Sequence, residues 1–112
     1  MDACLFCRIA RGEVPANIVR EDDTLVVFRD INPQAPIHLL AIPRRHIASV
    51  RELEGPDAGL LGALADALRN AADDEGAASY RLVTNVGPDA GQSVAHLHVH
   101  LLAGRRLGWP PG

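Results

Sequence analysis

A strict alternation of histidine with apolar residues near the carboxyl end places the strongest constraint on the fold of this chain. Residues 96–102 read His-Leu-His-Val-His-Leu-Leu. Successive side chains of a β-strand point to opposite faces, so this spacing predicts three imidazoles on one face, about 7 Å apart, and an apolar opposite face in the core. We predict a strand over 93–102. A polar face on which histidine recurs by accident is the less favoured interpretation, because imidazole is an uncommon side chain.

Four other apolar segments are also typical of strands. Asp22 and Asp23 favour a turn between the first two, which then form a hairpin. Residues 30–36 contain two prolines, which cannot donate ladder hydrogen bonds, so this segment is expected to be a loop. The four predicted strands cover residues 18–21, 24–29, 38–42 and 80–86.

Helical spacing is confined to two segments. Leu60, Leu64 and Leu68 form one apolar stripe of a helix predicted over 56–74, and a short helix is predicted over 5–11. Hairpins and one long helix, in place of alternating βαβ units, indicate an α+β fold with an antiparallel sheet.

Length and composition favour one domain over residues 1–112. The chain is 47 % apolar, which is sufficient for one core. It has no apolar run of 18 residues and no apolar segment after a charged start, so we expect no membrane span, no signal peptide and a cytoplasmic location. A net charge of −3 disfavours nucleic acid as a partner.

Cys4 and Cys7 are the two cysteines of the chain and lie three residues apart. A structural disulfide is not expected in a cytoplasmic protein, and this spacing suggests metal or redox chemistry. The pair alone supplies only half of a zinc site.

Two chemical interpretations of the three histidines compete, a catalytic metal site and a nucleophile with its helpers. The residues upstream favour the nucleophile. Glycines in the loop 87–92 allow backbone N–H groups to approach a phosphate closely, and Asn85, Gln92 and Ser93 add neutral donors. Asp89 is the only acid nearby, whereas a metal site would require further ligands.

The sequence resembles the histidine triad (HIT) nucleotide-binding proteins, in particular the purine nucleoside phosphoramidase branch. This resemblance extends over nearly the whole chain and implies a five-stranded antiparallel sheet with one long and one short helix, continued across a homodimer. The motifs that carry it lie at residues 4–9, 28–36, His38, 42–43, 45–47, 85–87, 91–94, 96–100 and 109–112.

The resemblance implies a catalytic role for each of five residues. His98 would attack the α-phosphorus of a purine nucleotide derivative, and water would hydrolyse the covalent nucleotidyl-histidine. His100 would contact the phosphate and the leaving group, His96 and His38 would orient imidazoles and phosphate oxygens, and Ser93 would pass a proton to the leaving amine. Neutral donors and imidazoles would stabilise the developing charge, so no cofactor is required for catalysis.

A nucleotide-binding set follows from the same resemblance. Asp30 would accept both ribose hydroxyls, and Phe6, Ile9, Phe28 and Ile31 would form an apolar slot for the base. For Ile9 and Phe28 an ordinary core position is an equally good interpretation. The phosphate would be contacted by Asn85, Gly91, Gln92, Ser93, Val94, His98 and His100.

Some relatives with this pattern hold a structural zinc ion. The corresponding ligands here would be Cys4, Cys7, His46 and His96, because two thiolates and two imidazoles form a closed tetrahedral site. Other members of the branch lack the cysteines. In that case His46 would be a surface histidine and the cysteines small core residues.

The leading functional hypothesis is therefore a hydrolase that cleaves the P–N bond of nucleoside 5′-phosphoramidates, including AMP-amine, AMP-lysine and aminoacyl-adenylate-like substrates, with AMP or GMP as the nucleotide. Two alternatives stay open, a dinucleotide polyphosphate hydrolase and a non-catalytic nucleotide-binding regulatory module. Residues 91–93 and 109–112 resemble the phosphoramidase branch more closely, and three intact histidines argue against a regulatory module. Trp109 would lie near the neighbouring site of a dimer or cap its own subunit.

Overall fold

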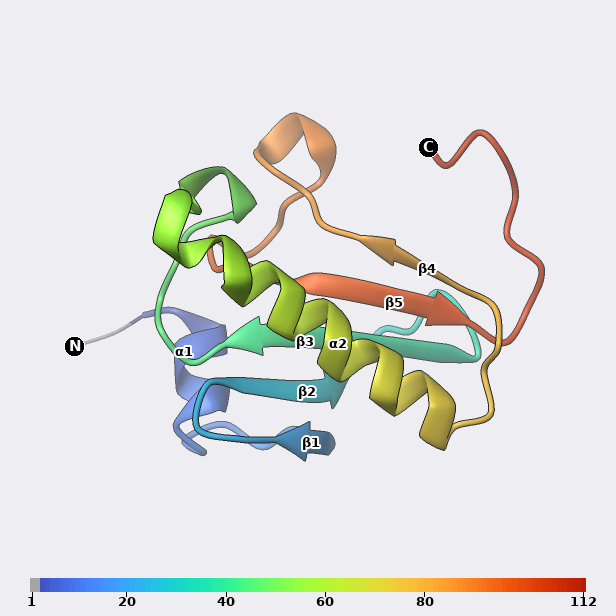
Figure 1. Ribbon diagram of the computed structural model, residues 1–112, viewed down its shortest axis with the longest axis horizontal. Coiled ribbons are helices and arrows are strands. Elements are labelled where there is room, and N and C mark those ends of the chain that lie inside the picture. Colours follow the sequence, from blue (N-terminus) through green and yellow to red (C-terminus); the bar gives the residue numbers. More distant parts are fainter. Residues whose placement is uncertain (1–2) are drawn as a thin grey trace.

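Five antiparallel strands form one sheet in the computed structural model, which describes residues 3–112. Their spatial order is β1-β2-β3-β5-β4, so the last strand of the chain lies between two earlier ones (Figure 1). The predicted α+β fold with a five-stranded antiparallel sheet is confirmed. Residues 1 and 2 of the predicted domain lie outside the described residues. The strands are β1 (Ile18–Glu21), β2 (Leu25–Arg29), β3 (Ile37–Pro43), β4 (Tyr80–Val83) and β5 (Val99–Ala103).

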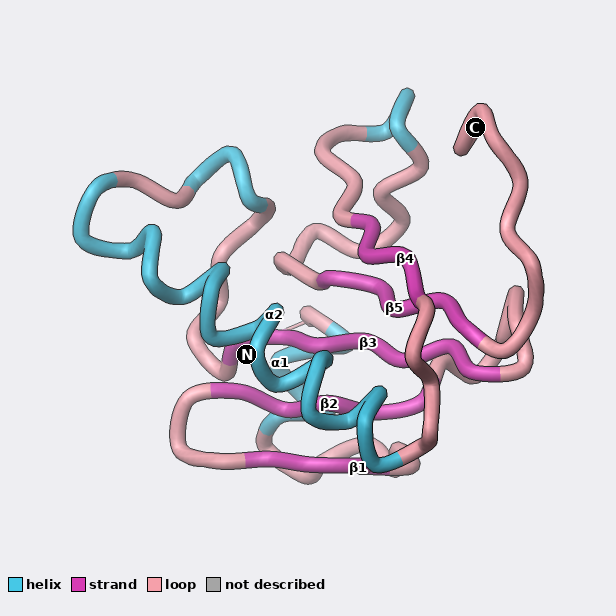
Figure 2. The backbone as a smooth tube through the Cα atoms, turned by 45° about the vertical axis from the view of Figure 1, so that its right-hand side comes forward, coloured by secondary structure: helices cyan, strands magenta, loops and turns pink. Residues whose placement is uncertain are grey.

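Two helices lie on opposite faces of this sheet (Figures 1 and 2). The long helix α2 (Ala58–Asp74) crosses one face, and the short helix α1 (Leu5–Ala10) packs on the other. Short 3₁₀ turns at Val50–Glu52 and Gly55–Asp57 precede α2, so the helix predicted from residue 56 begins two residues later. Within residues 3–112, no helix has the length and apolar character needed to cross a membrane.

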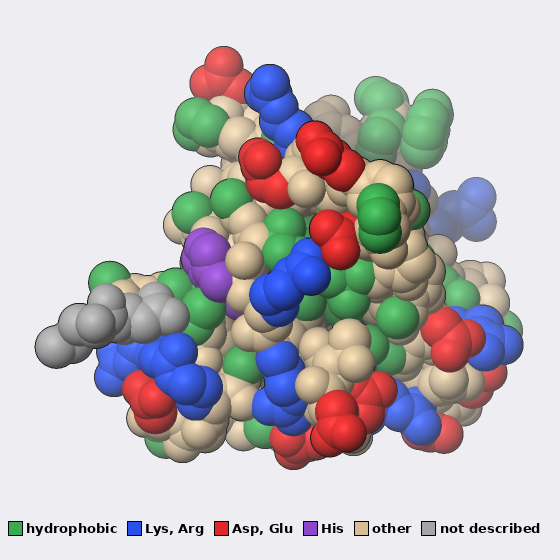
Figure 3. All heavy atoms as spheres, turned by 60° about the vertical axis from the view of Figure 1, so that its left-hand side comes forward, with side chains coloured by type: hydrophobic (Ala, Val, Ile, Leu, Met, Phe, Trp, Pro, Cys, Tyr) green, Lys and Arg blue, Asp and Glu red, His purple; other side chains and the backbone are tan. Residues whose placement is uncertain are grey.

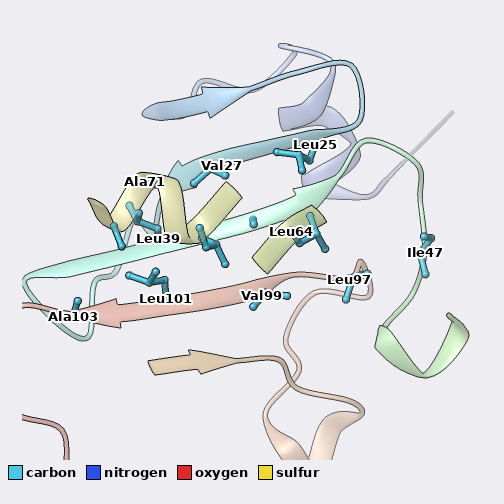
Figure 4. Packing of buried hydrophobic residues seen from close by; sticks show 13 residues of the cluster. Leu25, Val27, Leu39, Ile47, Leu64, Ala71, Leu97, Val99, Leu101 and Ala103 are labelled. Carbon is cyan, nitrogen blue, oxygen red and sulfur yellow. The ribbon is translucent and has the colours of Figure 1, made fainter. Parts of the chain in front are cut away.

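The core has two parts, one on each face of the sheet. Figure 4 shows the larger part, in which Leu64 and Leu68 of α2 pack on alternate residues of β2, β3 and β5. Leu97, Val99 and Leu101 belong to this part, so the apolar half of the predicted alternation does face the core. The smaller part, under α1, consists of Phe6, Ile9, Ala10, Val26, Phe28, Leu40 and Ile42.

The predicted strand over 93–102 is wrong at its start, because pairing begins only at Val99. The backbone N–H of Leu97 donates to the carbonyl of Ile47, 2.6 Å away in the loop that follows β3. This bond draws the chain away from β3 and ends the ladder.

The strand predicted over 80–86 is also shorter than expected, since β4 ends at Val83. The hydroxyl of Thr84 donates to the carbonyl of His98 at 2.8 Å. A side chain thus replaces the next ladder bond and satisfies the carbonyl beside the histidine segment.

Candidate active site

His98 has a defined tautomer because its backbone neighbour accepts its proton. The Nδ1 atom lies 2.7 Å from the carbonyl oxygen of His96, and a carbonyl can only accept. Nδ1 therefore carries the proton and Nε2 keeps its lone pair. The side chain is buried, with 5 % of its surface exposed. A neutral imidazole held in this way presents one nucleophilic nitrogen.

A second hydrogen-bonded chain fixes the protons of His38 and His100. The backbone N–H of Gln34 donates to His38 Nδ1 at 3.0 Å, which places the proton of a neutral His38 on Nε2. That nitrogen lies 2.9 Å from His100 Nδ1 and donates to it. His100 consequently carries its own proton on Nε2. Its ring centroid lies 5.0 Å from that of His98.

Burial keeps these two imidazoles neutral. It lowers the pKa of His100 to about 4, with smaller contributions from His98 and His38 opposed by the Asp30 carboxylate. Burial also lowers the pKa of His38, again opposed by Asp30. Near pH 7 the neutral tautomers of His38 and His100 therefore persist, and Nε2 of His100 offers an N–H donor beside the ring of His98. This arrangement can attack an electrophilic centre and donate a hydrogen bond to it at the same time.

Asp30 lies at the end of β2, where the chain turns into the loop that carries Gln34. One carboxylate oxygen accepts from the backbone N–H of Asn32 at 2.8 Å. The other lies 3.4 Å from His38 Nε2. The carboxylate is thus held between the histidine chain and solvent, with remaining lone pairs available to hydroxyl donors.

His96 occupies a different environment from the other two histidines of its segment. It is fully buried, and its Nε2 lies 2.9 Å from the carbonyl of Pro43, to which it donates. The opposite nitrogen, Nδ1, lies 3.3 Å from Cys4 Sγ and 3.5 Å from Cys7 Sγ. The side chain, for which we expected a role in orienting the phosphate, faces the thiols, and His96 contributes to the site through its carbonyl.

The four expected zinc ligands come together beside α1. His46 Nδ1 lies 3.2 Å from Cys7 Sγ, and the ligand atoms of Cys4, Cys7, His46 and His96 all lie within 4.8 Å of one another. The Pro43 carbonyl orients His96 so that the Nδ1 lone pair points at the sulfurs, as outer partners do for metal-ligating histidines. Two sulfurs and two imidazoles are a donor set that fits zinc.

A groove with a volume of about 820 Å³ opens beside Phe6. All four residues of the expected base slot line it, and Asp30, Ser93 and Val94 lie along the same groove. Ile31 is fully exposed at its edge. Three of the five histidines are buried, and a patch of imidazole surface is visible on the face in Figure 3. Sequence reasoning missed further lining residues, most of them in the segment between α1 and β1: Leu5, Val14, Pro15, Ala16, Asn17, Arg29 and Leu40.

The side chain of Gln92 holds its own loop together. Its Oε1 accepts from the backbone N–H of Gly87 at 2.9 Å, and its Nε2 donates to the carbonyls of Ala48 at 2.7 Å and Val94 at 3.0 Å. We expected this amide to contact the phosphate, yet the structure engages it with backbone. Asn85, Gly91, His98 and His100, also expected at the phosphate, are not among the residues that line the groove, and Phe6 is the groove residue that contacts His98.

Comparison with known proteins places this geometry in a family. A family profile described as "Scavenger mRNA decapping enzyme C-term binding" matches residues 3–107. An uncharacterised HIT-like protein of Synechococcus elongatus is 50 % identical over 109 residues, which cover 96 % of each chain. The chain belongs to the histidine triad family. This family accounts for the three histidines at alternate positions 96, 98 and 100.

Solved structures of the HIT family share the whole architecture. A protein described as a HIT family hydrolase from Legionella pneumophila is 50 % identical, with a TM-score of 0.94 over 97 % of this chain and 99 % of its own. A HIT family hydrolase from Clostridium thermocellum is 44 % identical, with a TM-score of 0.93 over 96 % of each chain. The predicted HIT fold is therefore confirmed.

Proposed function

We propose that this HIT family protein is a hydrolase that cleaves the P–N bond of purine nucleoside 5′-phosphoramidates through a covalent nucleotidyl-His98 intermediate. The observation that carries the proposal is the pair of opposite tautomers, a lone pair on His98 Nε2 beside an N–H on His100 Nε2. Solved relatives described as hydrolases support the reaction class.

The proposed reaction has two steps. His98 Nε2 forms a bond to the α-phosphorus as the P–N bond breaks, and the leaving amine takes a proton that Ser93 relays from solvent. Water then attacks phosphorus, the bond to His98 breaks, and the proton of the water returns to solvent. The His100 N–H donates to a phosphoryl oxygen whose negative charge grows in each transition state.

The groove supports a purine nucleotide as the bound part of the substrate. Its apolar lining suits a flat base, and Asp30 in the same groove offers carboxylate lone pairs that can accept from ribose hydroxyls. Ser93 and Val94 lie along the groove, where their backbone N–H groups would reach the phosphate. AMP and GMP derivatives both satisfy this chemistry.

The deciding experiment measures AMP release from adenosine 5′-phosphoramidate by the wild-type protein and by His98→Ala. We expect turnover only in the wild type, AMP binding in both, and an adenylylated His98 by mass spectrometry in wild-type samples quenched with denaturant at alkaline pH, because acid hydrolyses the bond between phosphorus and histidine. A dinucleotide polyphosphate assayed in parallel tests the alternative hydrolase. AMP binding without turnover of either substrate would favour the regulatory module instead.

We further propose that Cys4, Cys7, His46 and His96 hold a structural zinc ion. The ion would join α1 to the segment after β3 and to the backbone that precedes His98. Protein purified without chelator is expected to contain about one zinc per chain by elemental analysis. Removal of the metal with a chelator should lower Tm clearly while most of the activity remains. A zinc content far below one per chain would contradict the site.

A homodimer completes the proposal. β4 lies at an open edge of the sheet, where the apolar side chains of Leu82 and Val86 are 40 % and 39 % exposed. Pairing of this edge with a second copy would cover them and would continue the sheet. Trp109 is 82 % exposed and lies beside Arg81, so its indole is available to a neighbouring subunit. We expect the protein in the cytoplasm, where its thiols stay reduced.

A further inference from the structure

The ring of Phe6 contacts the nucleophile and the groove at the same time. It lines the groove, and its centroid lies 5.1 Å from that of His98 at an interplanar angle of 81°. This edge-to-face packing is the favoured geometry for two aromatic rings. Only 6 % of the Phe6 surface is exposed. One side chain therefore lies between the site proposed for the base and the atom proposed to attack phosphorus.

The imidazole of His98 needs such a contact to fix its plane. Among residues 3–112 its side chain forms one hydrogen bond, from Nδ1 to the His96 carbonyl, and its ring packs against that of His100 on one side and that of Phe6 on another. The χ2 torsion of histidine is broad, so one hydrogen bond restrains the tilt of the ring weakly. Packing by Phe6 limits that tilt, and with it the direction of the Nε2 lone pair.

Phe6 itself is held by two further ring contacts, one of them with a second residue that lines the groove. Its ring packs edge-on against Phe28, with centroids 5.6 Å apart, and against His96 at 6.0 Å. Its neighbour Cys7 lies against the imidazoles of His46 and His96, which hold α1 in place. The groove is the open side of Phe6, so a bound base would contact the ring there.

We propose that Phe6 is a positioning residue that couples occupancy of the groove by a purine to the alignment of His98. This inference rests on the proposed function and adds to it. Contact energy from the base, remote from the reacting bond, is then used to orient the nucleophile and raises kcat as well as lowering KM. A substrate that lacks the base should therefore have both a lower kcat and a higher KM.

The test compares two substrates with the same P–N bond, adenosine 5′-phosphoramidate and ribose 5-phosphoramidate. In the wild type we expect kcat to fall at least about tenfold when the base is absent, because small misplacements of a reacting group have effects of this size. In Phe6→Leu we expect kcat to be equally low with both substrates, since the leucine cannot transmit the contact.

Ile9→Ala is the matched control, because Ile9 lies on the same helix and lines the same groove without a ring contact to His98. It should raise KM for the adenosine substrate and keep the dependence of kcat on the base. A Phe6→Leu enzyme that retained this dependence and changed only KM would overturn the proposal. Phe6→Met serves in the same test if Phe6→Leu fails to fold.

A spectroscopic measurement separates this inference from the proposed reaction. Long-range ¹H–¹⁵N correlations report which imidazole nitrogen of His98 is protonated and how its environment changes. Adenosine, which has the base and no phosphate, should shift the His98 signals in the wild type and leave them unshifted in Phe6→Leu, at concentrations that saturate both proteins. Equal shifts in both would overturn the coupling, whereas a wild type that turns over neither substrate would refute the proposed function alone.

Discussion

The backbone N–H of Gln34 determines which nitrogens of two histidines carry protons. Because it donates to His38 Nδ1, the proton of His38 must lie on Nε2, and the proton of His100 must then also lie on Nε2. A loop backbone thus fixes the donor that the proposed transition state requires. Replacement of Gln34 by any residue that keeps a backbone N–H should preserve this pattern of protons. Gln34→Pro should abolish it, because proline has no backbone N–H.

The lowered pKa of His100 makes the free energy of unfolding depend on pH. The pKa of His100 is lowered from 6.5 to about 4 in the folded protein. As pH falls below the ordinary value, the unfolded chain binds a proton that the folded protein does not. This difference in proton binding favours the unfolded chain, so the free energy of unfolding that is present above about pH 6.5 decreases as pH falls toward 4. In His100→Gln this part of the acid destabilisation should disappear.

Urea unfolding of the wild type and of His100→Gln at pH about 7.5 and about 4.5 measures this effect. The comparison of the two proteins isolates His100 from the other titrating residues. The midpoint of the wild type should decrease more between the two pH values than that of His100→Gln. An equal decrease in both proteins would contradict a buried neutral His100.

The sequence identified the residue types of the site better than their partners. Alternation placed His98 and His100 correctly on the face away from α2. It treated the three histidines as equivalent, whereas His96 turns its imidazole toward Cys4 and Cys7, about ninety positions earlier in the chain. No local pattern contains such a pairing, and only the family resemblance brought these residues together. Likewise, nothing in the spacing indicated that Gln92 bonds its own loop.

The turn after β5 touches the loop that carries the site. Gly104 has φ +92°, and a Cβ there would lie 2.8 Å from Cβ of Pro36. Gly104→Ala should therefore lower the free energy of unfolding by about 1–3 kcal/mol, from strain and overlap together. Arg105 donates to the carbonyl of Gln34, so displacement of this turn should also lower kcat.

Gly62→Ala is the control for that change. Gly62 lies within α2, and a Cβ there would meet no atom of this chain within 4 Å. Alanine should stabilise the helix by about 0.5–1 kcal/mol in denaturant unfolding of the monomer. Equal effects of the two substitutions would show that the contact with Pro36 is unimportant.

Element identity followed from the sequence, and element ends did not. The leucine stripe predicted α2, and the Asp22–Asp23 turn is present, with the Asp22 carboxylate accepting from the N–H of Thr24 at 2.7 Å. The ends of β4 and β5 depend on a threonine hydroxyl and on the Ile47 carbonyl. Both are long-range partners that strand propensity does not reveal.

For the whole molecule, the open edge at β4 gives the sharpest prediction. Leu82→Arg should leave the fold of the monomer intact, because the side chain is already 40 % exposed, and should prevent pairing with a second copy. Size-exclusion chromatography with light scattering should find a dimer for the wild type and a monomer for the variant. A wild type that is monomeric at micromolar concentration would contradict the proposed homodimer.

The strand order also has a consequence for synthesis on the ribosome. β5 is the last strand to be made, yet it fills the position between β3 and β4. Until it emerges, β3 has an unpaired edge, β4 has no partner strand, and the part of α2 that packs on β5 is uncovered. The sheet can therefore close only after β5 has left the ribosome, and a fragment that ends before β5 is expected to be prone to aggregation.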